Sequence, residues 1–552
     1  MARCPGIVPV SMINTAARPG LNATIAPGLA IGAGLLILAG LFLGLLLTSD
    51  FATSDTALFT RRTWQLVWIT VVQAGLSTLL ALAVGMILAW SLHHQPHFPG
   101  RRLLIALFST AMVLPTLVVV LGLVSVLGRS GWFSQFWQMI GGDSFSGGIY
   151  GLGGILAAHI YFNAPFIGRG LLNRLDNLPA EQIRLSASLG LAGWNRFRLL
   201  EWPVMRSAIP SLAATVFLLC FTSFAIVLTL GGSPRFNTLE VAIYEAVRLD
   251  FDLGYAAKLA LLQLTICGSL IWISSGAPSA AAAVRRPTAW QGRERWVGAQ
   301  RLIITGLALA FVLPLTATMK DGLSSDLLEI WRQEVFLQAL ATSMVIATLS
   351  AGLTLALAWA LAVARVSLLA PSRLGGRGGA ALLAHGLAVA GALYLAVPAL
   401  VLGLGLFLLF RSFGADYGLV GPAAVLLANT LMALPFALAI FLPALTNAAS
   451  RYDRLAASLG LKGWARWRLL EGPMLRADLA FVAALSFCLS FGDMGVIALF
   501  GNQDFVTLPW LLYQKFGSYR TSEAAAIALV MLALTLITFV VAPKLAGGKA
   551  NA

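Results

Sequence analysis

The sequence predicts an all-α integral membrane protein with about twelve transmembrane helices in two parallel six-helix halves. Hydrophobic residues make up 59% of the 552 positions and charged residues 11%, whereas soluble domains average about 25% charged residues. Twelve apolar runs approach the length of about 20 residues that a helix needs to cross a bilayer. The third observation is a sequence repeat that divides the chain into two similar halves.

The apolar runs supply the helix count, and the basic residues supply the orientation. The runs lie near residues 27–47, 64–92, 103–128, 149–171, 207–230, 254–275, 301–319, 335–364, 380–410, 419–445, 477–500 and 523–543. Most of the 37 Lys and Arg residues fall in alternate connecting segments, including 172–206, 276–300 and 446–476. Because cytoplasmic segments of membrane proteins are enriched in Lys and Arg, we expect these segments and both termini in the cytoplasm. The formal net charge of +15 then reflects topology and anionic lipid, and we expect no nucleic acid partner.

The two halves of the sequence repeat each other. Residues 187–201 read ASLGLAGWNRFRLLE, and residues 457–471 read ASLGLKGWARWRLLE. With six spans in each half, the two repeats have the same orientation, and parallel repeats around a central path are a common transporter architecture. We therefore divide the chain into a first six-helix half (1–275), a cytoplasmic linker (276–300) and a second six-helix half (301–552).

Each half places this repeat in the long segment between its fourth and fifth helices. Aromatic and aliphatic residues recur there at three-residue spacing, which puts them on one face of a short helix. They are Trp194, Phe197 and Leu200 in the first half, and Trp464, Trp467 and Leu470 in the second. Such a helix could lie in the lipid headgroups, where Trp and Arg are favoured. It could also dock into a groove of a cytoplasmic partner, and two copies favour docking because a two-fold symmetric partner needs the same helix twice.

The spacing in this segment resembles the EAA loop of ABC importer permeases. A glycine is followed thirteen residues later by a proline, from Gly190 to Pro203 and again from Gly460 to Pro473. The resemblance implies a coupling helix that binds the nucleotide-binding subunit, with Leu200 and Leu470 at the aliphatic position before the proline. The glutamate that begins the family pattern is missing, because Arg184 and Arg454 stand in its place.

The resemblance extends over nearly the whole chain, to the fused, double-length permeases of thiamine importers. The most similar stretches are residues 221–232, 238–246 and 489–520. The resemblance implies the type I ABC importer permease fold, a location in the bacterial inner membrane, and import of thiamine and its phosphates by alternating access. It also implies an ABC ATPase dimer and a periplasmic solute-binding protein as partners. Ferric-iron and polyamine permeases share the loop, so those solutes are the alternative.

The sequence contains no G-x-x-x-x-G-K-[ST] motif, the loop with which P-loop proteins bind ATP phosphates. We therefore expect a transport subunit that is not itself an enzyme and holds no cofactor, while a partner hydrolyses ATP. Twelve helices in two halves also describe proton-coupled secondary transporters, which lack a repeated coupling loop. A membrane-embedded enzyme would need His, Asp or Glu residues converging at one depth, a pattern that the sequence does not show.

Three polar residues of the predicted spans are candidates for the substrate path. Asp493 follows an apolar run in the eleventh helix, where a carboxylate could attract a cationic substrate such as thiamine. His159 and Asn163 lie in the fourth helix. The alternative for all three is hydrogen bonding between neighbouring helices.

Three of the five histidines, His93, His94 and His97, fall within one turn of the chain. Their spacing could hold a metal ion, but we expect no acidic residue nearby to orient the ligands, and Pro96 interrupts the helix. We expect no metal site.

Overall fold

The computed structural model describes residues 21–48, 60–141, 149–191, 193–232, 236–274, 296–369, 378–414, 417–461 and 463–545. Across these ranges the chain forms helices and turns, without a β-strand. The all-α class predicted from the sequence is therefore confirmed. Most of the predicted linker 276–300 lies outside the described residues.

Ten helical segments of the described chain are long and apolar enough to cross a membrane. They are Ile25–Thr48, Arg61–His94, Thr116–Met139, Gly193–Phe221, Leu253–Ile273, Val297–Leu323, Glu334–Leu368, Val420–Asp453, Trp467–Phe491 and Thr521–Lys544. A bent pair, Gly379–Leu395 with Ala399–Ser412, adds an eleventh if it counts as one span. The remaining predicted span is α6 (Leu152–Asp176), whose 25 residues reach about 37 Å at about 1.5 Å per residue. Polar residues lower its hydropathy, which explains the difference from the twelve predicted.

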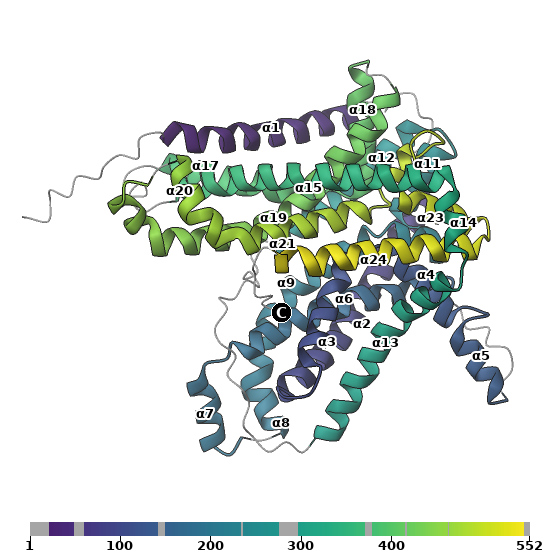
Figure 1. Ribbon diagram of the computed structural model, residues 1–552, viewed down its shortest axis with the longest axis horizontal. Coiled ribbons are helices and arrows are strands. Elements are labelled where there is room, and N and C mark those ends of the chain that lie inside the picture. Colours follow the sequence, from purple (N-terminus) through teal and green to yellow (C-terminus); the bar gives the residue numbers. More distant parts are fainter. Residues whose placement is uncertain are drawn as a thin grey trace, which may run out of the picture.

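The sequence repeat is visible as two sets of helices in the same order (Figure 1). The first set comprises α2 (Arg61–His94), α3 (Arg101–Thr110), α4 (Thr116–Leu127), α6, α9 (Trp202–Phe221), α10 (Ala225–Leu230), α11 (Leu239–Arg248) and α12 (Leu253–Ser274). The second comprises α15 (Glu334–Leu368), α17 (Gly378–Ala392), α18 (Ala399–Ser412), α19 (Tyr417–Ser458), α21 (Gly472–Phe491), α22 (Ile497–Phe500), α23 (Leu508–Gly517) and α24 (Thr521–Leu545). One hydrogen bond recurs in both: the amide of Leu239 donates to Thr70 Oγ1 at 3.0 Å, and the amide of Leu508 donates to Ser343 Oγ at 2.8 Å.

Several spans predicted as continuous are broken. The run 103–128 divides into α3, the short turn η2 (Ala111–Val113) and α4, with Pro115 at the start of α4. The run 380–410 divides similarly, and Pro398 precedes α18. Proline lacks a backbone N–H and disfavours helix in the residue before it, so each break falls where the hydrogen-bond ladder cannot continue. The runs 207–230 and 477–500 also break, because α9 ends at Phe221 and α21 ends at Phe491.

The first helix of each half packs against the other half. Helix α1 (Leu21–Thr48) contacts α15, α17 and α18 of the second half. Helix α13 (Val297–Leu323) contacts α2 and α4 of the first half, and also α24 of its own half. Glycine permits the close approach of α4 to α13 and of α18 to α1. A Cβ atom at Gly122 of α4 would collide with the carbonyl of Pro314 on α13, and a Cβ atom at Gly405 of α18 would collide with the ring of Phe42 on α1. Small residues of this kind allow helix backbones to approach closely in membranes.

The two halves meet at one end of the molecule and diverge toward the other. Figure 1 shows α11, α12 and α23 together, while α8 (Gly193–Arg196) and α20 (Gly463–Arg466) lie apart. We call these the α11 end and the α8 end. At the α11 end the Arg248 guanidinium of the first half donates to the carbonyl of Gly501 at 2.8 Å and lies 5.8 Å from the centre of the Trp510 ring.

Candidate functional site

The repeated segments form the same local structure in both halves, and we call them the coupling segments (residues 180–203 and 450–473). In the first, α7 (Ala180–Ser188) ends at a turn, followed by α8, one π-helical turn η3 (Phe197–Glu201) and then α9. In the second, α19 ends at the same turn, followed by α20, the π-helical turn η5 (Trp467–Glu471) and α21.

Glycine is required at the turn that ends the first helix of each segment. Gly190 has a φ of 65° and Gly460 a φ of 63°, values that residues with a Cβ atom adopt at a cost. The amide of the following Leu191 donates to the carbonyl of Ser186 at 2.9 Å, and the second half repeats this contact. This is the Schellman arrangement that ends helices with a left-handed glycine. A Cβ atom would meet no neighbour at either glycine, so the backbone conformation alone imposes the residue type.

The predicted aromatic stripe is only partly exposed. Trp194 is 71% exposed, and its ring stacks on Phe197 with the centroids 5.2 Å apart. Phe197 and Leu200 are half-buried and pack toward the helix core. In the second half Trp467 and Leu470 are also half-buried, whereas the side chain of Trp464 lies outside the described part. Pro203 and Pro473 stand in the first turns of α9 and α21, where a missing N–H costs no helical bond.

Exposed leucines that the stripe did not include enlarge the apolar surface. Leu189 and Leu199 are 65% and 62% exposed, and their counterparts Leu459 and Leu469 are 64% and 65% exposed. All four lie in the repeated sequence, but their positions do not follow a three-residue spacing. The break between α7 and α8 and the π-helical turn bring them out of the helical pattern. Each segment therefore exposes an apolar surface of matching composition.

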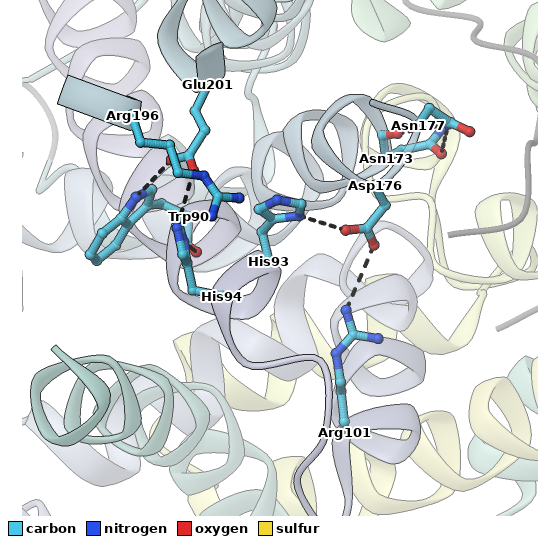
Figure 2. A network of polar contacts seen from close by, with 9 residues as sticks. All are labelled: Trp90, His93, His94, Arg101, Asn173, Asp176, Asn177, Arg196 and Glu201. Atoms are coloured by element: carbon cyan, nitrogen blue, oxygen red, sulfur yellow. Dashed lines mark hydrogen bonds and ion pairs between the residues drawn. The ribbon is translucent and has the colours of Figure 1, made fainter. Parts of the chain in front are cut away.

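Buried charges attach the first coupling segment to α2, as Figure 2 shows. Glu201, at the end of η3, lies 2.9 Å from Arg196 Nε and 3.1 Å from His94 Nε2, and Trp90 Nε1 donates to its other oxygen at 3.2 Å. Its side chain is 1% exposed. Beside it, His93 Nδ1 lies 2.8 Å from the carboxylate of Asp176, the last residue of α6.

The acidic neighbours of His93 and His94 correct the expectation that no acidic residue would lie close to them. Asp176 and Glu201 are more than eighty residues distant in the sequence, and the packing of α2 against α6 and η3 brings them together. The described residues nevertheless include no group of three or more His, Cys, Asp or Glu side chains placed to hold a metal ion.

The candidate path residues of α6 lie between helices of the first half. His159 is 2% exposed, and its Nδ1 lies 2.8 Å from both Gln73 Nε2 and Ser77 Oγ of α2. Asn163 Nδ2 donates to the carbonyl of His159 at 2.9 Å and contacts Cys220 Sγ on α9 at 3.4 Å. In this conformation both side chains hold α2, α6 and α9 together.

Asp493 lies at the break between α21 and α22. Its two carboxylate oxygens accept hydrogen bonds from the amides of Gly495 and Val496, each at 3.2 Å. The side chain also lines a small cavity together with Asn429 and Ser490, and Asn429 Nδ2 donates to Ser490 Oγ at 2.9 Å. Among the described contacts none joins Asp493 to His159 or Asn163.

Comparison with known proteins identifies the architecture. Residues 81–275 match the family model described as the binding-protein-dependent transport system inner membrane component. The chain is 38% identical over 546 residues to the thiamine transport system permease protein of Salmonella typhimurium, covering 97% of this chain and 99% of that one. The chain belongs to this permease family. Similar relatives include the thiamine transport system permease proteins of Escherichia coli, 40% identical over 88% of this chain and 89% of the relative, and of Brucella abortus, 37% identical over 98% of both.

Membership agrees with the all-helical architecture described above. The fold is that of type I ABC importer permeases, and the protein is a multi-pass component of the inner membrane that serves as a transport subunit. The chain also matches a sulfate transport system permease protein of Salmonella typhimurium at 27% identity, but over only 38% of its length. The similarity to thiamine permeases, by contrast, extends through both coupling segments.

Proposed function

We propose that this permease imports thiamine and its phosphates, using ATP that a separate ABC ATPase dimer hydrolyses. The observation that carries the proposal is the similarity to thiamine transport permeases over 97% of the chain and 99% of the relative. A periplasmic solute-binding protein would deliver the substrate at the α11 end. This chain contributes the path and supplies no cofactor.

The ATPase would bind at the α8 end, which we place in the cytoplasm together with both termini. The basic residues Arg198 and Arg468 support this orientation, because both lie in coupling segments and are exposed. The apolar surfaces around Leu199 and Leu469 support docking, since exposed leucine is unfavourable in water and suits a groove on a partner.

The arrangement of the halves supports alternating access. They contact each other at the α11 end while the coupling segments stand apart (Figure 1), as in an inward-open state. Closure of an ATPase dimer would bring the two segments together and separate the halves at the α11 end. ATP can drive this change only if it binds the two states with different affinity.

Asp493, His159 and Asn163 remain our candidates for the substrate path. A carboxylate near the α11 end suits the positive charge of thiamine, and we expect Asp493→Asn to lower uptake while leaving the folded protein intact. Asp504→Asn, an exposed acid of the adjacent loop, is the matched control. Equal uptake by both variants would remove Asp493 from the path.

The decisive experiment reconstitutes the permease with its ATPase and binding protein in vesicles and measures uptake of thiamine, ferric iron and spermidine. Selective, ATP-dependent thiamine uptake is expected. Uptake of iron or spermidine instead would assign one of the alternative substrates, and uptake driven by a proton gradient without ATP would indicate a secondary transporter.

Docking has its own test. We expect Leu199→Asp combined with Leu469→Asp to release the ATPase from the purified complex, because each change places a carboxylate in an apolar interface. Asn195→Asp, which adds the same charge at an exposed polar position of the first segment, should leave the complex assembled. Retention of the ATPase by the leucine variant would contradict docking at this surface.

A further inference from the structure

The two coupling segments are attached to the membrane helices in different ways. We propose that His94 is a positioning residue that ties the first coupling segment to α2, so that the halves receive the movement of the ATPase through different helices. This inference rests on the proposed function, because it assumes that an ATPase moves the two segments.

The tie in the first half is direct and buried. His94 is the last residue of α2, and Glu201 ends the π-helical turn of the coupling segment. The side chains are 7% and 1% exposed, and 3.1 Å separates His94 Nε2 from Glu201 Oε1. Arg196 of α8, with its side chain 3% exposed, contacts the same carboxylate oxygen. Separating buried polar groups leaves each without a partner, which makes a buried contact resistant to sliding.

The His94 ring contacts an acceptor on each side. Its Nδ1 lies 2.9 Å from the carbonyl of Trp90, one turn earlier in α2, while its Nε2 faces Glu201. The ring therefore lies between an oxygen of its own helix and an oxygen of the coupling segment. The same Trp90 donates its indole N–H to Glu201, so two side chains of α2 bind one carboxylate of the coupling segment (Figure 2).

The contact continues from α2 into α6 and α3. His93 Nδ1 lies 2.8 Å from one oxygen of Asp176, and Arg101 of α3 lies 3.7 Å from the other. Helices α2 and α6 also pack along their lengths, and His159 binds Gln73 between them. A displacement of the first coupling segment is therefore transmitted to α2 and α6 together.

The second half lacks this connection in its sequence. Thr70 of α2 accepts a hydrogen bond from the amide of Leu239, and Ser343 of α15 accepts the equivalent bond from the amide of Leu508. These matching contacts align α2 with α15. This alignment places Val366 and Ser367 where α2 has His93 and His94. Neither of these residues carries a charge that could bind the carboxylate of Glu471.

In the second coupling segment the charged contacts stay within the segment, which begins with the last turns of α19. Arg466 Nε lies 2.6 Å from Glu471 Oε1, and another nitrogen of the same guanidinium lies 2.7 Å from Asp453 of α19. These side chains are 16–34% exposed, so water screens them more than the Glu201 cluster. In the first half Ile183 occupies the place of Asp453 in the repeat. The second segment therefore moves with α19, whose helix continues into it, whereas buried side chains tie the first segment to α2.

The experiment replaces His94 with serine, the residue of the second half. In the reconstituted transporter we expect His94→Ser to keep the ATPase bound and hydrolysing. Thiamine uptake per ATP should fall about two- to thirtyfold, which corresponds to the coupling changes caused by single residues. His385→Ser, the same substitution at an exposed position of α17, should leave this ratio unchanged. His94→Gln, whose amide can still donate to Glu201, should restore part of it.

A distance measurement separates positioning from a loss of stability. Spin labels at Asn195 and His97, both exposed, report the separation of the first coupling segment from the end of α2 once the native cysteines are replaced. We expect a broader distance distribution in His94→Ser than in the parent and in His385→Ser. If His94→Ser does not fold, Trp90→Phe, which removes one donor to Glu201, should give the same broadening and a lower ratio.

The outcomes distinguish this inference from the proposed function. A parent without ATP-dependent uptake would overturn the proposed function itself. The parent protein could instead transport thiamine while folded His94→Ser keeps both its uptake per ATP and its distance distribution. That result would overturn only the role of His94.

Discussion

Replacing Glu240 with glutamine should stabilise this protein above neutral pH. Glu240 lies in α11 and is 0% exposed. One of its carboxylate oxygens accepts a hydrogen bond from Gln263 Nε2 at 3.0 Å, while the other has no hydrogen-bond partner within the described part of the chain. Burial raises the pKa of Glu240 from 4.5 to about 8, because the charged form loses its hydration without gaining a cation.

The size and sign of the effect follow from this difference in pKa. A carboxyl whose folded pKa lies above its unfolded value retains its proton in the folded state, so its contribution is largest below pH 4.5 and declines as the pH rises to about 8. At about 1.4 kcal/mol for each pKa unit, the loss across this window is on the order of 5 kcal/mol. Glutamine does not titrate, and its amide can also donate to Gln263 Oε1, an acceptor without a described partner.

Thermal unfolding in detergent, followed by tryptophan fluorescence from about pH 5 to pH 8.5, measures the effect. The parent should lose stability as the pH rises, and Glu240→Gln should lose much less, so the two curves meet at low pH and separate at high pH. Glu329→Gln, an exposed carboxylate of α14 (Leu327–Arg332), is the control and should follow the parent. Parallel curves for Glu240→Gln and the parent would show that Glu240 is ionised in the folded protein and would refute the reasoning.

Three further substitutions test other contacts. Gly190→Ala should cost about 1 kcal/mol in local stability and weaken ATPase binding in a pull-down, because alanine is strained at a φ of 65°. Gly122→Ala should lower the unfolding temperature, since its Cβ atom would collide with a backbone carbonyl of α13 and overpacking costs about 1–3 kcal/mol. Gly75→Ala, where a Cβ atom meets no neighbour, is the control for both glycine variants. If all three variants had the same stability and bound the ATPase equally, both predictions would be contradicted. Arg248→Ala removes a contact between the halves at the α11 end, so it should raise the rate of ATP hydrolysis measured in the absence of the binding protein. Arg520→Ala is the control, because the Arg520 side chain is 61% exposed, and it should leave this rate unchanged.

The short helix in each repeated segment shows what can be read from local sequence. The three-residue spacing that begins at Trp194 and Trp464 predicted it, and the structure has α8 and α20 there. The role of these segments in binding an ATPase stays a prediction. The exposed Leu199 and Leu469 were not predicted, because the π-helical turn changes which residues face outward and no sequence pattern announced it.

The breaks within the spans were also missed, although Pro115 and Pro398 marked two of them. Hydropathy averages over a window, so a proline between two apolar runs barely alters the profile. The break after Phe491, which places Asp493 between α21 and α22, has no proline at all. Its carboxylate is held by the amides of Gly495 and Val496, a local arrangement that averaged hydropathy does not register.

By itself the sequence determined the all-α membrane class, the two-fold repeat, the apolar spans and the short helix of each coupling segment. Each of these depends on composition or on residues close together in the chain, where hydrophobic length and backbone conformation decide the outcome. Only the tertiary structure decided that α1 and α13 pack on the opposite halves, that Glu201 meets His94, and that Arg466 bridges Glu471 and Asp453 in the second coupling segment. These contacts join residues that are distant in the chain, and they depend on how helices cross in three dimensions.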